Sequence, residues 1–210
     1  LEIPNYPTAI DLIVSDEGFG RNPYLESQAP IVIVTGAGLG SGKLSTCLSQ
    51  LYHDHRWGIA SGYAKFETFP IWNLAVDHPV NLAYEAATVD LGDISMIDPV
   101  HLQAYGITAT NYNRDVESFP ILKTIMDRIA GDDGGMLRYQ SPTDMGVNRA
   151  GTGISDDGAV REAAKQEVIR RYYRHMWEWR RSLSPHQTVE LTKKLMARLG
   201  ITPTDRPVVE

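Results

Sequence analysis

A glycine-rich loop between an apolar run and a helical pattern constrains this chain most. Residues 31–43 read IVIVTGAGLGSGK, so a β-branched run is followed by alternating glycines and a lysine. The apolar run predicts a strand over Ile31–Thr35, and the leucine spacing that follows predicts a helix over Leu44–His55. Glycine lets a phosphate approach the backbone, and the first turn of a helix presents free N–H groups to it. The segment therefore predicts a phosphate-binding loop.

The loop matches nucleotide-binding motifs only in part. Against the pattern GxxxxGK[ST], Ala37 replaces the first glycine and Leu44 replaces the magnesium-binding hydroxyl. The dinucleotide fingerprint GxGxxG also fails, because its third glycine would fall on Ser41. A plain strand-to-helix turn with an exposed lysine is the alternative interpretation. The residues expected to bind a phosphate-bearing cofactor are Gly38, Gly40, Ser41, Gly42, Lys43, Ser45 and Thr46.

An acidic pair follows the first apolar run. Residues Ala9–Ser15 predict a buried strand, and Asp16 and Glu17 come directly after it. In nucleotide enzymes such carboxylates hold a metal or orient water, so both are candidate catalytic residues. An ordinary turn is the competing interpretation, because Asp and Gly commonly follow strands.

Further polar residues are expected around the same pocket. Residues 62–69 predict a third strand, on which Lys65 and Glu67 share one face. Lys65 is the third candidate catalytic residue. The residues expected to bind substrate, because they cluster at the ends of elements, are Glu67, Asn73, Asn111, Asn113, Arg114 and Asp115. No residue is assigned to a metal, and the cofactor stays open.

The rest of the chain predicts helices. Pro79 starts one through Leu91, Asp98-Pro99 starts a short one to Tyr105, and a third carries Pro120 in its early turn. A GDDGG break at 131–135 suggests a boundary between an α/β region, 1–133, and a linker with a helical region, 134–210. Long helices are expected over 159–182 and after Pro185. The predicted fold class is α/β: a strand–glycine-loop–helix sandwich region followed by a mainly helical region.

The composition of the chain argues against some classes of binding partner. The net charge of −6 argues against nucleic acid or an anionic membrane as the default partner. Cys47 is the only cysteine, which excludes an intrachain disulfide. No apolar run approaches a membrane span, so a cytoplasmic protein is expected.

Several runs together resemble a known family. IDLIVSDEGFG, GYAKFETFPIWNL, HPVNLAYEAAT, MIDPVHLQAYG, NYNRDVESFP and SPTDMGVN are similar, in the same order, to a bacterial family of large uncharacterised proteins. Members are longer, and this chain resembles their central portion. Their loop is usually proline-rich, so Gly36, Ala37 and Leu39 depart from it. The resemblance implies an α/β sandwich region joined to a helical region, and it implies no established activity.

Two functional hypotheses follow. In the first, the chain binds a phosphorylated small molecule or nucleotide through residues 36–43, with phosphoryl-transfer or hydrolytic chemistry as an option. In the second, the chain is a non-catalytic ligand-binding or oligomer-assembly module. Tyr172, Tyr173, Met176, Trp177 and Trp179 would supply the interface in the second case.

Overall fold

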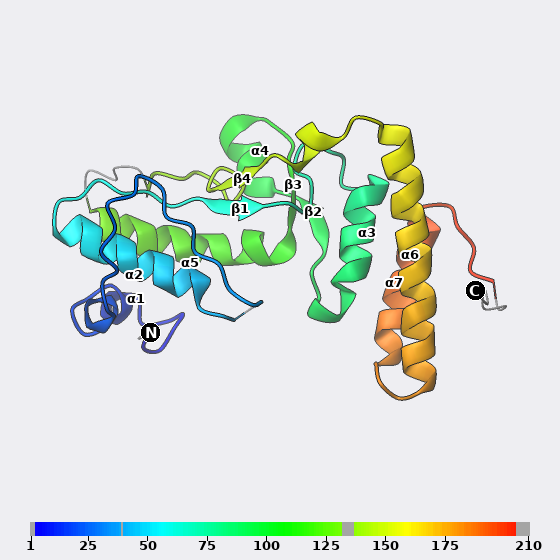
Figure 1. Ribbon diagram of the computed structural model, residues 1–210, viewed down its shortest axis with the longest axis horizontal. Coiled ribbons are helices and arrows are strands. Elements are labelled where there is room, and N and C mark those ends of the chain that lie inside the picture. Colours follow the sequence, from blue (N-terminus) through cyan, green and yellow to red (C-terminus); the bar gives the residue numbers. More distant parts are fainter. Residues whose placement is uncertain (1–2, 39, 132–136, 205–210) are drawn as a thin grey trace. The chain divides into compact units, whose positions relative to one another are not determined.

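The computed structural model describes residues 3–38, 40–131 and 137–204. The chain is mixed α/β and mainly helical, as Figure 1 shows. It divides into a first compact unit, residues 1–64 and 118–139, and a second, residues 65–117 and 140–210. The domain boundary expected at 133/134 lies outside the described residues and stays a prediction. No helix among the described residues is both long and apolar enough to cross a membrane.

The first unit is built on helices. It contains α1 (Ile10–Ile13), a 3-10 turn (Phe19–Arg21), α2 (Lys43–Arg56) and the part of α5 (Asn113–Ala130) from Ser118 onward. The buried side chains include Ile13, Phe19, Leu48, Leu51 and Tyr52, together with Leu122, Ile125, Met126 and Ile129 of α5.

The prediction of a strand over Ala9–Ser15 is wrong. Residues Ile10–Ile13 form a single helical turn, in which Ile13 is buried and Leu12 is 38% exposed. A short apolar run does not by itself distinguish a strand from a buried helical turn. Here the backbone of Ile13 bonds to the carbonyl of Ala9, so a local hydrogen bond replaces a strand partner.

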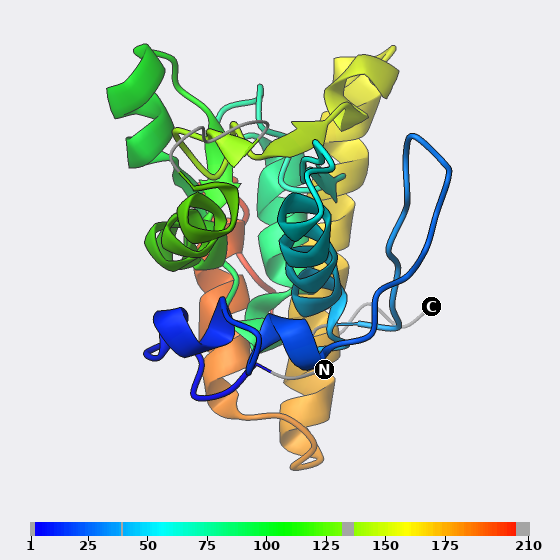
Figure 2. The same ribbon diagram turned by 90° about the vertical axis from the view of Figure 1, so that its left-hand side faces the viewer.

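The segment before α2 is an open loop in this chain. Residues 31–35 form neither helix nor strand, which corrects the strand predicted there, and Figure 2 shows the segment without regular structure. The helix half of the prediction is confirmed, since α2 covers Lys43–Arg56 against the expected Leu44–His55. Gly42 precedes it in the left-handed region at φ 85°, a conformation that glycine adopts at no steric cost.

The second unit contains two small sheets. β1 (Lys65–Glu67) pairs in parallel with β4 (Gly146–Asn148), and β2 (Ser95–Ile97) pairs antiparallel with β3 (Thr110–Tyr112). Only Lys65–Glu67 of the strand predicted over 62–69 forms a strand. Its alternation is confirmed, because Phe66 is 73% exposed while its neighbours on the opposite face are partly buried.

The helices of the second unit follow local start and stop signals. α3 (Pro79–Ala87) starts at a proline after His78, whose side chain accepts from the Val80 amide. α4 (Pro99–Tyr105) is capped by Asp98 and stops at Gly106. α6 (Asp157–Arg180) is capped by Asp156, and α7 (His186–Arg198) follows Pro185.

The core of the second unit lies where α3, α6 and α7 pack together, and Figure 1 shows α6 and α7 side by side. The spacing of the buried residues on α6 and α7 fits one apolar face per helix. The buried members of this core are Leu82, Ala83, Ala86, Ala164, Val168, Tyr172, Val189, Leu195 and Met196.

Candidate functional site

The polar groups of the glycine loop form hydrogen bonds with one another. The Lys43 ammonium donates to the Gly38 carbonyl at 2.7 Å and to Ser41 Oγ at 3.0 Å, and Ser41 Oγ donates to the same carbonyl at 2.8 Å. The loop therefore folds around the lysine, with Gly40 also in the left-handed region at φ 70°. A phosphate that bound Lys43 here would replace bonds that the loop makes to itself.

The start of α2 has no side-chain cap. Gly42 supplies no side chain, and the Ser45 and Thr46 hydroxyls both donate back to the Gly42 carbonyl at 2.9 Å. The first backbone bond of the helix joins the Thr46 amide to Gly42. The first amides of an α-helix have no partner within the helix, and they carry the positive end of its dipole. An anion is the natural complement of this end.

The predicted acidic pair, which follows α1, lies away from the glycine loop. Asp16 accepts a 2.8 Å hydrogen bond from the Tyr52 hydroxyl and lies 3.4 Å from the Arg56 guanidinium, whereas Glu17 pairs with Arg21. Tyr52 is nine residues beyond Lys43, which corresponds to about 14 Å along an α-helix. The structure therefore does not bring Asp16 and Glu17 to the glycine loop.

Asp16 instead borders a cavity of about 400 Å³ in the first unit. Burial, and next the hydrogen bond to Asp16, raise the pKa of the Tyr52 phenol. The cavity is lined by Val14, Ser15, Asp16, Tyr52, His55, Arg56, Arg128 and Ile129. Arg128 is paired with Asp11 at 2.7 Å, so part of the positive charge around the cavity is already balanced.

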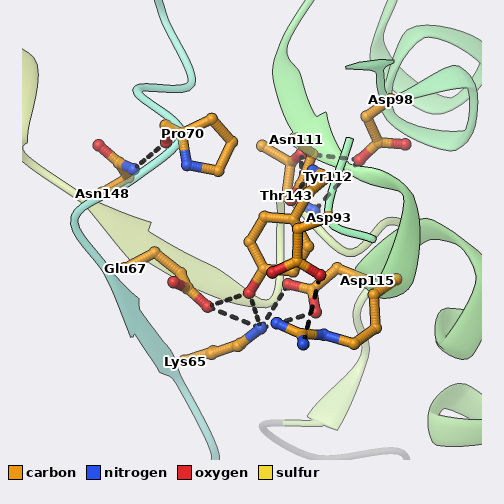
Figure 3. A network of polar contacts seen from close by, with 11 residues as sticks. Lys65, Glu67, Pro70, Asp93, Asp98, Asn111, Tyr112, Asp115, Thr143 and Asn148 are labelled. Atoms are coloured by element: carbon orange, nitrogen blue, oxygen red, sulfur yellow. Dashed lines mark hydrogen bonds and ion pairs between the residues drawn. The ribbon is translucent and has the colours of Figure 1, made fainter. Parts of the chain in front are cut away.

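Several predicted residues meet around Lys65 in the second unit. The Lys65 ammonium lies 2.6 Å from both carboxylate oxygens of Asp115, 2.6 Å from Glu67 and 2.5 Å from the Tyr112 hydroxyl. Tyr112 donates in turn to Glu67 at 2.8 Å. Figure 3 shows these side chains converging from β1, β3 and the first turn of α5. We call Lys65, Glu67, Asp93, Tyr112, Arg114 and Asp115 the Lys65 network.

The charge state of the Lys65 network follows from its partners. Burial alone would lower the pKa of Lys65, but the carboxylates of Asp115 and Glu67 outweigh it and raise that pKa. Burial and the same carboxylates raise the pKa of Tyr112. Lys65 is therefore a fixed cation at neutral pH and Tyr112 a neutral phenol, an arrangement suited to electrostatic positioning and unsuited to a lysine nucleophile.

Arg114 extends the network to Asp93. Its guanidinium lies 3.3 Å from Asp93 and 5.1 Å from the centre of the Tyr112 ring. The Asp93 side chain is only 3% exposed. Burial raises the pKa of Asp93, and the charge of Arg114 acts against that rise. With two cations and three carboxylates, the network carries a net charge of −1 when all are ionised.

The predicted asparagines have other partners. Asn111 is fully buried; it donates to Thr143 Oγ1 at 3.1 Å and accepts from the Tyr112 amide. Asn113 accepts from the Ile94 amide at 2.9 Å and donates to the Gly92 carbonyl. Asn73 lies beside Gly151, where an added Cβ would be 2.6 Å from its side-chain oxygen. Asn113 thus joins the end of β3 to the segment before β2, and Asn111 joins β3 to Thr143.

A second buried network was missed by sequence reasoning. Asp98 accepts from Thr143 Oγ1 at 2.7 Å with one oxygen (Figure 3). With the other oxygen it accepts from the Val100 and His101 amides at 2.9 Å. The Ser141 hydroxyl, which accepts from the Asp144 amide, lies 2.8 Å from His101 Nδ1. Ser141 is fully buried, so this Ser–His pair has no exposed nucleophile. The capping role of Asp98 was readable from the Asp-Pro pair, but its tertiary partner was not.

Comparison with known proteins places the chain among uncharacterised sequences. Residues 1–200 match the model of a family described as "Domain of unknown function DUF1846, N-terminal". A "UPF0371 protein" of Corynebacterium diphtheriae is 58% identical over 208 residues, covering 99% of this chain and 41% of the relative. Relatives from Streptococcus thermophilus and Clostridium botulinum, also named UPF0371 proteins, are 56% and 54% identical and are covered to 41% and 40% of their length. The chain thus spans about two fifths of the curated relatives that it matches.

Proposed function

Because this chain belongs to the DUF1846 family of unknown function, we propose a function from its own residues: it binds a phosphate-bearing small molecule or nucleotide through loop 36–43. The observation that supports this proposal is the start of α2, where Gly42 leaves the helix without a side-chain cap and Lys43 stands at the first helical position. Helix amides, dipole and ammonium all favour an anion at that place.

The contacts of Lys43 support one way for a phosphate to bind the loop. The Lys43 ammonium now donates to the Gly38 carbonyl and Ser41 Oγ, both of which belong to the loop itself. A phosphate oxygen that accepts from Lys43 would replace these neutral acceptors with a charged one, and charge-assisted hydrogen bonds are the stronger kind. Gly38 and Gly40 have open space where a Cβ would lie, so the backbone is accessible to a ligand.

The support is for binding more than for phosphoryl transfer. Asp16 and Glu17 were the candidates to hold a metal or orient water, and they lie beside Tyr52 and Arg21. The hydroxyls of Ser45 and Thr46 are bonded to the Gly42 carbonyl. We therefore assign no catalytic step to these residues and propose the loop as a binding element.

Calorimetric titration with ATP and with inorganic phosphate, each with and without magnesium, tests the proposal. We expect heat of binding for the unsubstituted chain and none for Lys43→Ala, with unchanged circular dichroism. Lys193→Ala is the matched control, because Lys193 is an exposed lysine on α7 and its loss changes the charge equally. Equal binding by the Lys43→Ala variant, or no binding by the unsubstituted chain, would contradict the proposal.

A second candidate function, assembly with a second copy of the chain, rests on an exposed aromatic surface. At the end of α6, Trp177 is 50% exposed, Trp179 40% and Leu183 68%. The Arg181 guanidinium lies 4.1 Å from the Trp177 ring centre. Exposed Trp and Arg side chains are enriched at interfaces.

Light scattering over a dilution series tests the assembly. We expect a mass above that of one chain which Trp179→Ala lowers. Trp57→Ala, which removes a 57% exposed tryptophan of the first unit, should leave the mass unchanged. A monomer at every concentration would contradict this second candidate.

A further inference from the structure

The apolar run before the glycine loop is left in solvent. Ile31 is 79% exposed, Val32 60% and Ile33 80%, the largest exposed fractions of any apolar segment of this length among the described residues. The backbone of residues 31–35 makes no hydrogen bond to any other described residue. Val34 is partly buried, whereas the three residues before it are exposed. Such a β-branched run without backbone partners is unusual for a folded protein, because it exposes apolar surface together with unpaired backbone groups.

The pattern of the run indicates what kind of partner it fits. Val, Ile and Thr favour extended backbone, and Ile31, Val32, Ile33 and Val34 are apolar on both faces of a strand. A strand that is apolar on both faces belongs inside a sheet covered on both sides, most often a parallel one. A single helix or a flat surface would bury only one of these two faces.

The relatives contain polypeptide that could supply such a sheet. The matched region is 41% of the length of the Corynebacterium diphtheriae relative, so more than half of that protein lies outside it. We propose that, in the longer family members, the segment corresponding to Ile31–Thr35 is a strand within a sheet formed by polypeptide outside the matched region. This inference goes beyond the proposed ligand and stands independently of it.

The position of the segment gives the inference a structural consequence. Residues 31–35 run directly into the glycine loop and then into α2. In open α/β sheets the carboxyl ends of the strands carry the ligand-binding loops, because strand and helix fix the loop between them. Here the helix is formed and the strand is not, so only one end of the loop is anchored in this chain.

Hydrogen–deuterium exchange tests the inference on two samples, this 210-residue chain and the full-length Corynebacterium diphtheriae relative, both without ligand. We expect residues 31–35 of this chain to exchange at the rate of an open loop. The aligned segment of the relative should exchange at least about 100-fold more slowly, as a core strand does. Fast exchange of that segment in the full-length relative would overturn the inference.

The alternative is that a second copy of this chain pairs with residues 31–35. A dilution series distinguishes this pairing from pairing with polypeptide outside the matched region. If residues 31–35 of this chain become protected as its concentration rises, a second copy occupies the segment and the inference is wrong. Protection that is already present in the dilute chain would overturn it too, since no outside polypeptide is then needed. Because no phosphate is added, either result leaves the calorimetric test of the glycine loop unaffected.

Discussion

The Lys65 ammonium lies 2.6 Å from both carboxylate oxygens of Asp115, a residue 50 positions further along the chain. The contact joins β1 to the first turn of α5, while the Tyr112 hydroxyl, 2.5 Å away, connects the same ammonium to β3. The lysine therefore connects β1 to β3 and to the start of α5, which directly follows β3 in the chain. Its carboxylate partners are mostly buried, so its removal has a predictable cost.

Replacing Lys65 by Met should destabilise the protein by about 3 kcal/mol, because Glu67 and Asp115 would keep their charges without a cation between them. The Lys65 side chain is 29% exposed and Asp115 only 9%, so solvent compensates poorly. Urea unfolding at pH 7 measures the change. Lys193→Met, at an exposed site, is expected to stay within about 0.5 kcal/mol. A similar small value for Lys65→Met would show that the network does not stabilise the fold.

Acid should remove a stabilising contribution from Glu167. Hydrogen bonds from Arg170 and Arg171 lower the pKa of this carboxyl from 4.5 to about 2. A lowered pKa in the folded state gives stability that is present above pH 4.5 and is lost as the pH falls towards 2. Glu167→Gln should therefore be about 0.5 kcal/mol less stable at pH 6, and the difference should vanish near pH 2. Paired urea titrations at the two pH values check this, and a pH-independent difference would refute it.

Gly146 tests how tightly β4 packs. A Cβ there would lie 2.3 Å from the Trp72 ring and 3.0 Å from the Lys65 carbonyl, so Gly146→Ala must displace the ring or the strand. We expect a loss of about 2 kcal/mol in the free energy of unfolding, typical of overpacking. Gly153→Ala is the control, because a Cβ at Gly153 meets no atom within 4 Å. Thermal unfolding of both variants gives the comparison, and equal melting temperatures would contradict the close contact.

Asp98 and Asp156 both cap helices, yet replacing them should lower the free energy of unfolding by different amounts. Asp156 caps α6 from an exposed position, so Asp156→Ala should cost about 1 kcal/mol. Asp98 is fully buried and also accepts from the Thr143 hydroxyl, which would be left unpaired. Asp98→Ala should therefore cost about 3 kcal/mol. Chemical denaturation of both variants measures the ratio, and a smaller loss for Asp98→Ala than for Asp156→Ala would contradict the buried role.

Part of the candidate site was predictable from sequence. Alternation on a strand placed Lys65 and Glu67 on one face, and the structure confirms that alternation. Arg114 and Asp115 were candidates because polar residues cluster ahead of the helix predicted there; both lie in the first turn of α5 and belong to the Lys65 network. Tyr112 and Asp93 were missed, because a tyrosine in a strand and an aspartate in a loop give no signal that they meet. Asp16 was expected near the glycine loop, but it accepts a hydrogen bond from Tyr52, which lies on a turn of α2 far from that loop.

The sequence by itself determined several helix starts, because prolines and capping carboxylates act on neighbouring residues. Pro79 and Asp98-Pro99 start helices where expected, and the short helix ends at Tyr105 as predicted, whereas the helix predicted through Leu91 ends at Ala87. Only the tertiary structure decided whether the short apolar runs form strands, because a strand exists only when another strand pairs with it through backbone hydrogen bonds. Ile10–Ile13 closes its bonds locally as a helical turn, and Ile31–Thr35 finds no partner among the described residues. Tertiary packing also chose the partners of Lys65, since ionic contacts across 50 residues depend on how separate elements come together.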